Sequence, residues 1–206
     1  MACGTGSLSL PLASRCKNLL AIDHSEDMLS VFKSKSDYQT IKEHITIRRG
    51  DFCDFSRNED GVFDMFLIPF NSLASLTSPK NQHHLFRQCA DCLRKGGILA
   101  IDLWFPMRQK ETSHRSSLIG TADVGKWIMY SQERFPDSKT RSVNILLIPL
   151  DTQKRPVLTS FSEYVYNPSE IRALFINNHF TVKRMPLSNP VVNSEKRRGI
   201  YLGYKQ

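Results

Sequence analysis

Apolar residues follow two different spacings along the first hundred residues of the chain. Nearly continuous apolar runs, typical of strands buried in a parallel sheet, alternate with segments in which apolar residues recur at helical spacing. Strands are predicted at 18–23, within 45–52, at 62–70 and at 98–105. Helices are predicted to begin at Ser25 and at Ser78–Pro79, and Gly96–Gly97 is predicted to end the second helix. This alternation predicts a doubly wound α/β fold with a mainly parallel sheet.

After Pro106 the spacing changes to that of an antiparallel meander. Turn-rich segments separate three strand candidates, at 126–135, 140–150 and 157–167. Asn167 and Glu170 then form the capping box of a helix, and two further strands are predicted to close the sheet, at 180–185 and 198–204. We therefore divide the chain into residues 1–106, a three-stranded antiparallel insertion at 107–166, and residues 167–206, which complete the first unit.

Composition places the chain among ordinary globular proteins, with 40% apolar and 23% charged residues over 206 positions. No apolar run approaches the roughly 18 residues of a membrane span, and the N-terminus lacks the layout of a secretion signal, so we expect a cytoplasmic chain with no membrane partner. The net charge of +8 comes mainly from residues 101–206, where 16 Lys and Arg face 9 Asp and Glu. This excess permits an anionic ligand, but the basic residues come mostly in pairs, as on a solvated surface.

The five cysteines form an odd, scattered set, which indicates reduced thiols rather than a disulfide framework. The one close pair is Cys89 and Cys92, downstream of two histidines. Cys89 falls at helical spacing with Leu85 and Phe86, so we assign it to the core and predict no metal site.

Candidate chemistry lies at the carboxyl ends of the predicted strands, where open α/β sheets bind ligands. Four signals occur there in order: the glycine turn ACGTG at 2–6, Asp23, Gly50–Asp51, and PFNS at 69–72. Each is weak alone, because glycine and aspartate also form ordinary turns. Together they indicate a nucleotide-type ligand site.

In this order the motifs resemble those of the class I S-adenosylmethionine-dependent methyltransferases. The segments that carry the resemblance are ACGTG (2–6), AIDHSEDML (21–29), RRGDFCDF (48–55), FDMFLIPFNSLASLT (63–77) and LRKGGILAIDLW (93–104). The likeness covers nearly the whole chain. It implies a Rossmann-like sheet, S-adenosyl-L-methionine as cofactor, and transfer of its methyl group to a small molecule.

The resemblance assigns cofactor binding to residues at the strand ends: Ala2, Cys3, Gly4, Gly6, Asp23, His24, Met28, Asp51, Phe52, Pro69, Phe70 and Asn71. It implies that Gly4 and Gly6 let the backbone approach the methionine part, and that Asp23 accepts hydrogen bonds from the ribose hydroxyls. Met28 would pack on the adenine, whose amino group and ring nitrogen would bond to Asp51 and to the Phe52 N–H. Residues 69–71 would border the sulfonium.

The second half of the chain resembles the N,N-dimethyltransferases of nucleotide-linked amino sugars, on WFP (104–106), the antiparallel insertion and RGIYLG (198–203). This likeness implies an amine acceptor. Ser75 stands where these relatives tend to have a histidine that could receive the amine proton, so no catalytic residue is assigned. Arg198 could bind a substrate phosphate, although a surface cation is the simpler interpretation. The insertion would cover the site or form a homodimer contact.

Three other interpretations stay open. A nicotinamide-dependent oxidoreductase fits GTGSLS in part, with Ser9 in the third small position. An RNA methyltransferase fits the basic second half, but IPFNS (68–72) lacks the Asn-Pro-Pro-aromatic pattern of many base-amino methyltransferases, so no nucleic-acid partner is favoured. In the family, a central strand that ends in an acid precedes the glycine loop. We therefore expect a missing first strand, which makes a truncated, non-catalytic fragment the third alternative.

Overall fold

The computed structural model describes residues 1–51, 53–105, 114–122, 127–185 and 198–206. Its N-terminal part pairs two parallel strands, β1 (Leu19–Asp23) and β2 (Ile45–Arg49). Helical segments surround this pair: α1 (Ser9–Ala13), α2 (Glu26–Ser34), α3 (Ser36–Ile41) and the 3₁₀ turn η1 (Lys42–His44). The Ser25 hydroxyl caps α2 by accepting the Met28 N–H at 3.3 Å, as predicted.

A second sheet has the strand order β3-β4-β10-β9. It is formed by β3 (Phe63–Ile68), β4 (Leu93–Trp104), β9 (Phe180–Met185) and β10 (Arg198–Lys205). The β3–β4 pair is parallel, while β10 runs antiparallel to both of its neighbours. The remaining helical segments are α4 (Arg57–Asp60), the 3₁₀ turn η2 (Ser72–Ser75), α5 (Pro79–Cys92) and α6 (Pro168–Ile176). The capping box of α6 is present as predicted, with Asn167 and Glu170 each accepting the other's backbone N–H.

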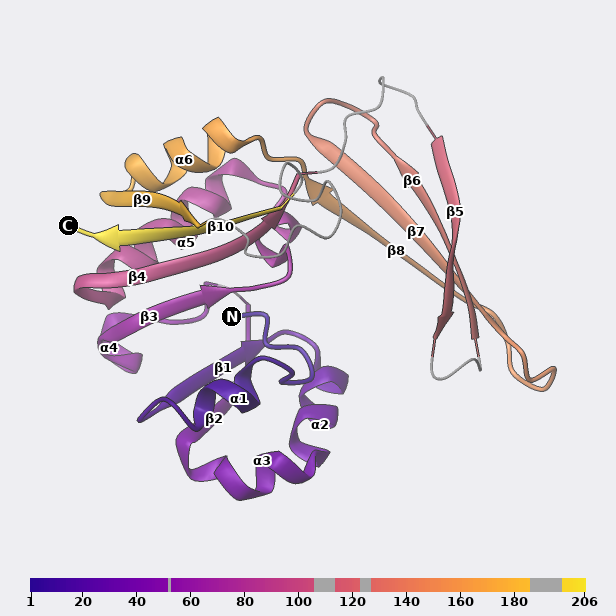
Figure 1. The fold of residues 1–206 in the computed structure, drawn as a ribbon, viewed down its shortest axis with the longest axis horizontal. Helices are drawn as coiled ribbons and strands as arrows, with labels where there is room; N and C mark the ends of the chain where they lie inside the picture. The colour runs from indigo at the N-terminus through magenta and orange to yellow at the C-terminus, as the bar shows by residue number, and fades with distance from the viewer. Residues whose placement is uncertain (52, 106–113, 123–126, 186–197) are drawn as a thin grey trace.

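Residues 1–3 lie between the two sheets (Figure 1). The Met1 amino group donates to the Leu67 carbonyl of β3 at 2.9 Å, and the Cys3 N–H donates to the Ile22 carbonyl of β1 at 3.0 Å. These two bonds connect the segment to both sheets. The glycine turn therefore starts beside the ends of β1 and β3.

The third sheet is antiparallel and projects away from the other two (Figure 1). Its strands, in order, are β5 (His114–Ala122), β6 (Trp127–Arg134), β7 (Thr140–Pro149) and β8 (Val157–Tyr164). The last three match the predicted strands. The sequence reading missed β5, which lies in the middle of a polar stretch and offers no apolar run.

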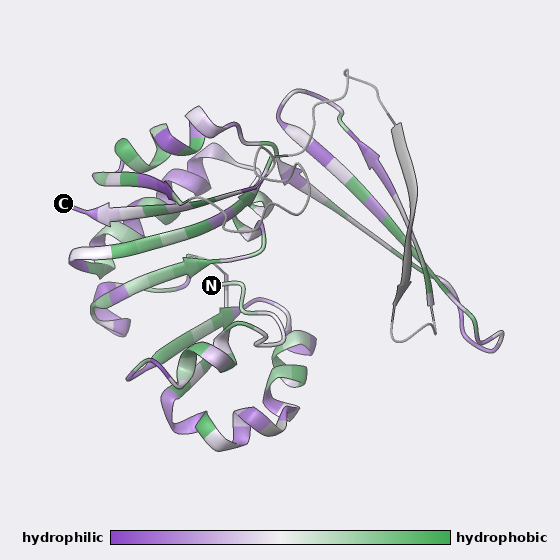
Figure 2. Ribbon diagram, viewed as in Figure 1, coloured by the Kyte–Doolittle hydropathy of each residue, from purple (hydrophilic) through white to green (hydrophobic). Residues whose placement is uncertain are grey.

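The main core lies between the second sheet and its helices. The Phe86 ring of α5 is fully buried and meets Phe175 of α6 edge-on at 5.0 Å between ring centroids. Cys89 is buried in the same cluster, as predicted. Figure 2 shows that hydrophobic residues run along β1 and β4, whereas hydrophilic and hydrophobic residues alternate along β7.

Two local predictions were wrong. Helix α5 ends at Cys92, and Gly96–Gly97 lie inside β4 rather than at the helix terminus. Strand β3 is not buried on both faces, because its first half exposes Asp64 and Met65. None of the helices in the described ranges is long and apolar enough to span a membrane.

Candidate functional site

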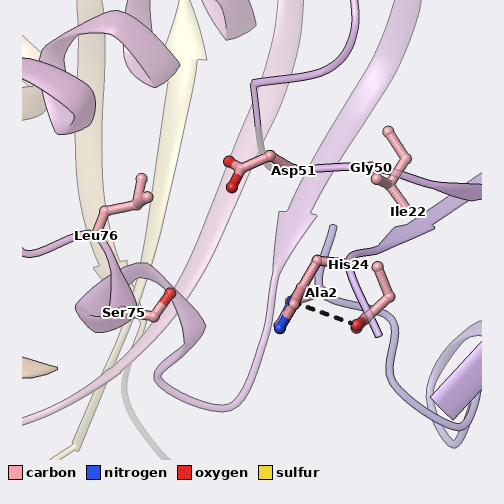
Figure 3. Close-up of a pocket in the computed structure, with 8 residues that line it drawn as sticks. Ala2, Ile22, His24, Gly50, Asp51, Ser75 and Leu76 are labelled. Carbon is pink, nitrogen blue, oxygen red and sulfur yellow. Dashed lines mark ion pairs between the residues drawn. The ribbon is translucent and has the colours of Figure 1, made fainter. Parts of the chain in front are cut away.

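A cavity of about 180 Å³ opens at the carboxyl ends of β1 and β2 (Figure 3). Three segments that are distant in sequence meet there: the glycine turn, the two strand ends and the η2 turn. The residues that line it are Ala2, Ile22, Asp23, His24, Gly50, Asp51, Ser75 and Leu76. The cavity is smaller than the 300–1,000 Å³ of typical ligand pockets, so its volume could enclose only part of a nucleotide-sized molecule.

The glycine turn is built from left-handed residues. Ala2, Gly4 and Gly6 have φ angles of 50°, 53° and 76°. A side chain on Gly6 would collide with the Phe32 ring of α2, so this position requires glycine both for its backbone angle and for space. The turn therefore packs closely against the first βα unit, and Ala2 at its start lines the cavity.

Asp23 organises the cavity from the end of β1, where its side chain is buried. Its Oδ2 accepts the Gly4 N–H at 2.7 Å and its Oδ1 accepts the Ser25 N–H at 3.0 Å. The Gly50 N–H donates to the Asp23 carbonyl at 3.0 Å, which joins the ends of β1 and β2. Each carboxylate oxygen keeps acceptor capacity for a ligand hydroxyl.

Asp51 extends from the end of β2 into the space that faces Ser75 and Leu76 (Figure 3). Its N–H donates to Asp54 Oδ2 at 2.5 Å. The Arg48 guanidinium donates to the Asp54 carbonyl and to both carboxylate oxygens of Asp60. Asp51 is therefore linked through Asp54 to this ion pair.

The segment after β3 contains two consecutive left-handed residues, Phe70 and Asn71, with φ angles of 53° and 62°. Asp102 of β4 holds them, because its Oδ2 accepts the Phe70 N–H at 3.1 Å and its carbonyl accepts the Asn71 N–H at 3.0 Å. Arg198 forms a two-point ion pair with the same carboxylate, at 2.7 and 2.6 Å. Arg198 is a partly exposed cation, in line with the simpler interpretation, and its ion pair also supports this loop.

The structure brings together four of the predicted cofactor residues in the cavity lining, Ala2, Asp23, His24 and Asp51. Gly4 is joined to them by its bond to Asp23. Cys3, Gly6, Met28 and residues 69–71 do not line the cavity. Met28, which the resemblance assigns to the adenine, is 47% exposed. Phe52 lies outside the described residues.

Sequence reasoning missed Ile22 and Leu76 as cavity residues, and it named Ser75 without placing it in the site. Ile22 precedes Asp23 in the strand, so its position follows from the same signal. Leu76 lies in the motif at 63–77 but was not named as a site residue, and the η2 turn brings it to the cavity. Cys3 lies beside the cavity, where burial and the nearby Asp23 raise the pKa of its thiol to about 11. The thiol therefore stays protonated at neutral pH, and a nucleophilic role is disfavoured.

The lining combines two carboxylates with apolar Ile22 and Leu76, and it contains no Lys or Arg. Such a surface accepts hydrogen bonds from hydroxyl and amino groups, and among the described lining residues it offers a phosphate neither Lys nor Arg. Among the described residues, no cluster of His, Cys, Asp or Glu could hold a metal ion.

Comparison with known proteins shows which proteins this chain is similar to. Residues 1–97 match the family described as "Methyltransferase domain". The fold is that of the class I S-adenosylmethionine-dependent methyltransferases. A methyltransferase of this kind from Clostridium acetobutylicum superposes with a TM-score of 0.81 at 20% identity, over 99% of this chain and 81% of that one. An amino pentose methyltransferase from Micromonospora echinaspora, solved with S-adenosylmethionine bound, gives 0.72 at 16%, over 100% and 81%.

One curated relative is similar in sequence to part of the chain. The putative methyltransferase YqeM of Bacillus subtilis (strain 168) is 29% identical over 143 residues, which are 69% of this chain and 55% of the relative. The chain thus spans about half the length of that relative. The cavity of this chain lies at the carboxyl ends of the parallel strands β1 and β2. Open α/β sheets bind their ligands at this edge.

Proposed function

We propose that the chain binds S-adenosyl-L-methionine in this cavity and transfers its methyl group to a small molecule. The observation that carries the proposal is the position of Asp23 and Asp51 at adjacent strand ends in one cavity, whose described lining has no Lys or Arg. An adenosyl ligand presents ribose hydroxyls and an exocyclic amine, and both groups donate to carboxylates. The residues present therefore fit the cofactor.

In this proposal Asp23 holds the ribose, and the glycine turn carries the methionine part. Asp23 already orders Gly4 and Ser25 through its two oxygens, so it couples the turn to the ribose position. Asp51 takes the amino group of the adenine, and Ile22 and Leu76 supply apolar contact. The bond from the Asp51 N–H to Asp54 helps to orient Asp51 before the cofactor binds.

The bound cofactor supplies a methyl group attached to positively charged sulfur, which is activated without help from an acid. The chain's task is to align the acceptor with that methyl group and to exclude water. We assign the acceptor side to residues 69–71 and the neighbouring antiparallel sheet, which meet through a hydrogen bond from Asn71 Nδ2 to Glu163 Oε1 at 3.2 Å. The Micromonospora relative acts on an amino pentose, which supports an amine as the acceptor.

Calorimetry with S-adenosylhomocysteine and with NADH tests the proposal. We expect micromolar binding of S-adenosylhomocysteine and none of NADH, because a dinucleotide needs its pyrophosphate on a glycine loop that opens a long helix. Here the helix after the turn, α1, has five residues. Binding of NADH alone would contradict the proposal and favour an oxidoreductase.

Titration with RNA tests the small-molecule assignment. We expect weak binding at physiological salt, because two described arginines of the second half, Arg141 and Arg198, are paired with acids. Submicromolar affinity that fell steeply with added salt would show phosphate neutralisation and overturn the assignment.

A further inference from the structure

Asn71 connects three parts of the molecule through its side chain and its carbonyl. Its Oδ1 accepts the Trp104 N–H at the end of β4 at 2.9 Å, and its Nδ2 donates to Glu163 of β8 at 3.2 Å. Its carbonyl accepts the Ala74 N–H at 2.9 Å, which closes the η2 turn. The antiparallel sheet is therefore joined by a hydrogen bond to the residue that precedes the turn.

Glu163 is itself held in place by the antiparallel sheet. Arg141 of β7 lies across from it and binds its other carboxylate oxygen. The same guanidinium binds Glu133 of β6 at 2.9 Å. The exposed fractions of Glu133, Arg141 and Glu163 are only 24%, 22% and 18%. With one oxygen on Arg141 and the other on Asn71, the Glu163 carboxylate has a fixed orientation.

The η2 turn connects Asn71 to the cavity wall. Asn71 precedes the turn, and Ser75 and Leu76 at its end form the wall that faces Asp51 (Figure 3). The Ser75 hydroxyl donates to the Ser72 carbonyl at 2.8 Å, so the turn moves as a unit. A shift of Asn71 would therefore displace the cavity wall.

We propose that Glu163 is a positioning residue of the cavity, which acts through Asn71 to set the η2 wall against which the cofactor packs. The inference rests on the proposed function, because it assumes that this cavity holds the cofactor. It makes the antiparallel sheet a part of the binding site as well as a neighbour of it.

The polarity of the Asn71–Glu163 pair offers a direct test, because donor and acceptor can be exchanged. In Asn71→Asp two carboxylates face each other, and in Glu163→Gln an amide cannot satisfy both Asn71 and Arg141. In the double variant, the amide introduced on β8 donates to the carboxylate introduced before η2 and accepts from Arg141, and the total charge is unchanged. Glu133→Gln is the matched control, since it weakens the same ion cluster without contact to Asn71.

The measurement is the dissociation constant of S-adenosylhomocysteine by calorimetry, with the thermal midpoint of each variant beside it. We expect each single variant to weaken binding by about 5- to 10-fold and the double variant to return within about twofold of the wild type. Glu133→Gln should lower the midpoint and leave the affinity unchanged. If Asn71→Asp does not fold, Asn71→Gly keeps the left-handed backbone and loses both side-chain bonds.

The outcomes separate the two proposals. A wild-type protein that does not bind S-adenosylhomocysteine would overturn the proposed function and this inference with it. A wild-type protein that binds, with single variants of equal affinity or a double variant that stays weak, would overturn the inference alone. An equal loss in Glu133→Gln would also overturn it, because the cluster would then act as general support.

Discussion

The sheet that carries α5 and α6 and the antiparallel sheet β5–β8 are stabilised in different ways. The first buries a continuous cluster in which Phe86 and Phe175 are fully inaccessible. In the described side chains of the second, β8 exposes Val157, Leu158 and Phe161, and the central strand β7 buries Val143. Apolar burial therefore accounts for the first region and for little of the second.

Polar contacts between strands take the place of burial in the antiparallel sheet. Arg141 joins β6, β7 and β8 through its two carboxylate partners. Asn144 bonds to Gln132 on one side and to Ser160 on the other, at 3.3 and 2.8 Å. Such contacts fix direction and register more than they add stability. The core therefore sets the stability of the molecule, whereas a few polar groups set the position of the antiparallel sheet at the site.

The largest expected effect is on the free energy of unfolding. It compares a Phe→Ala substitution in the core with one in the antiparallel sheet. Phe86→Ala should lower the free energy of unfolding by about 3–5 kcal/mol, because it leaves a cavity in a closely packed core. Phe161→Ala, at a side chain that is 43% exposed, should cost about 1 kcal/mol or less. Denaturant unfolding followed by circular dichroism measures both. Similar losses for the two variants would contradict the contrast.

A smaller effect is expected from the ion cluster of the antiparallel sheet. Arg141→Gln leaves Glu133 and Glu163 without their shared partner and should cost about 1–3 kcal/mol. Arg134→Gln, at an exposed position of the same sheet, is the control and should be nearly neutral. Fluorescence of Trp127 on β6, with Trp104 replaced by Phe, follows the sheet during unfolding. Equal stability of the two variants would show that the cluster does not hold the strands.

The smallest effect concerns an ion pair in the α/β part and depends on pH. The Arg48 guanidinium holds the pKa of the Asp60 carboxyl below its ordinary value of 3.8. The lowered folded-state pKa means that the ionised carboxylate stabilises the fold above about pH 4, and this contribution is lost as the pH falls through the folded-state pKa.

Asp60→Asn should therefore cost about 1–2 kcal/mol at pH 7, and its difference from the wild type should shrink below pH 4. Unfolding curves of both proteins between pH 7 and pH 3 make the comparison. A difference that stayed constant over this range would mean that the ion pair is not its source.

The sequence predicted most strands and caps because their signals are local. The run before Asp23, the Ser25 cap and the Asn167–Glu170 box depend on neighbouring residues, and each is present in the structure. Strand β5 has no such signal, since its pairing with β6 rather than its own composition makes it a strand. The end of α5 was misplaced because β4 starts at Leu93, before the expected glycine stop.

The site was predictable only where its residues follow strands. Asp23 and Asp51 end consecutive strands, so parallel topology brings them together. Leu76 lies in a quoted motif, but only the η2 turn places it in the cavity, and Glu163 reaches Asn71 through a long-range contact outside any motif. The partnership of Arg198 with Asp102 joins residues 96 positions apart, and the pairing of β4 with β10 creates it.

The most direct test of the account is the affinity for S-adenosylhomocysteine after removal of the Asp23 carboxylate. Asp23→Ala should weaken binding by about 1–3 kcal/mol, the cost of leaving ribose hydroxyls unpaired in a partly buried site. Asp27→Ala, at an exposed acid in the first turn of α2, changes the charge equally and should leave the dissociation constant within about twofold. If calorimetry gave both variants the affinity of the wild type, the cofactor would not bind at the end of β1, and the central claim would be wrong.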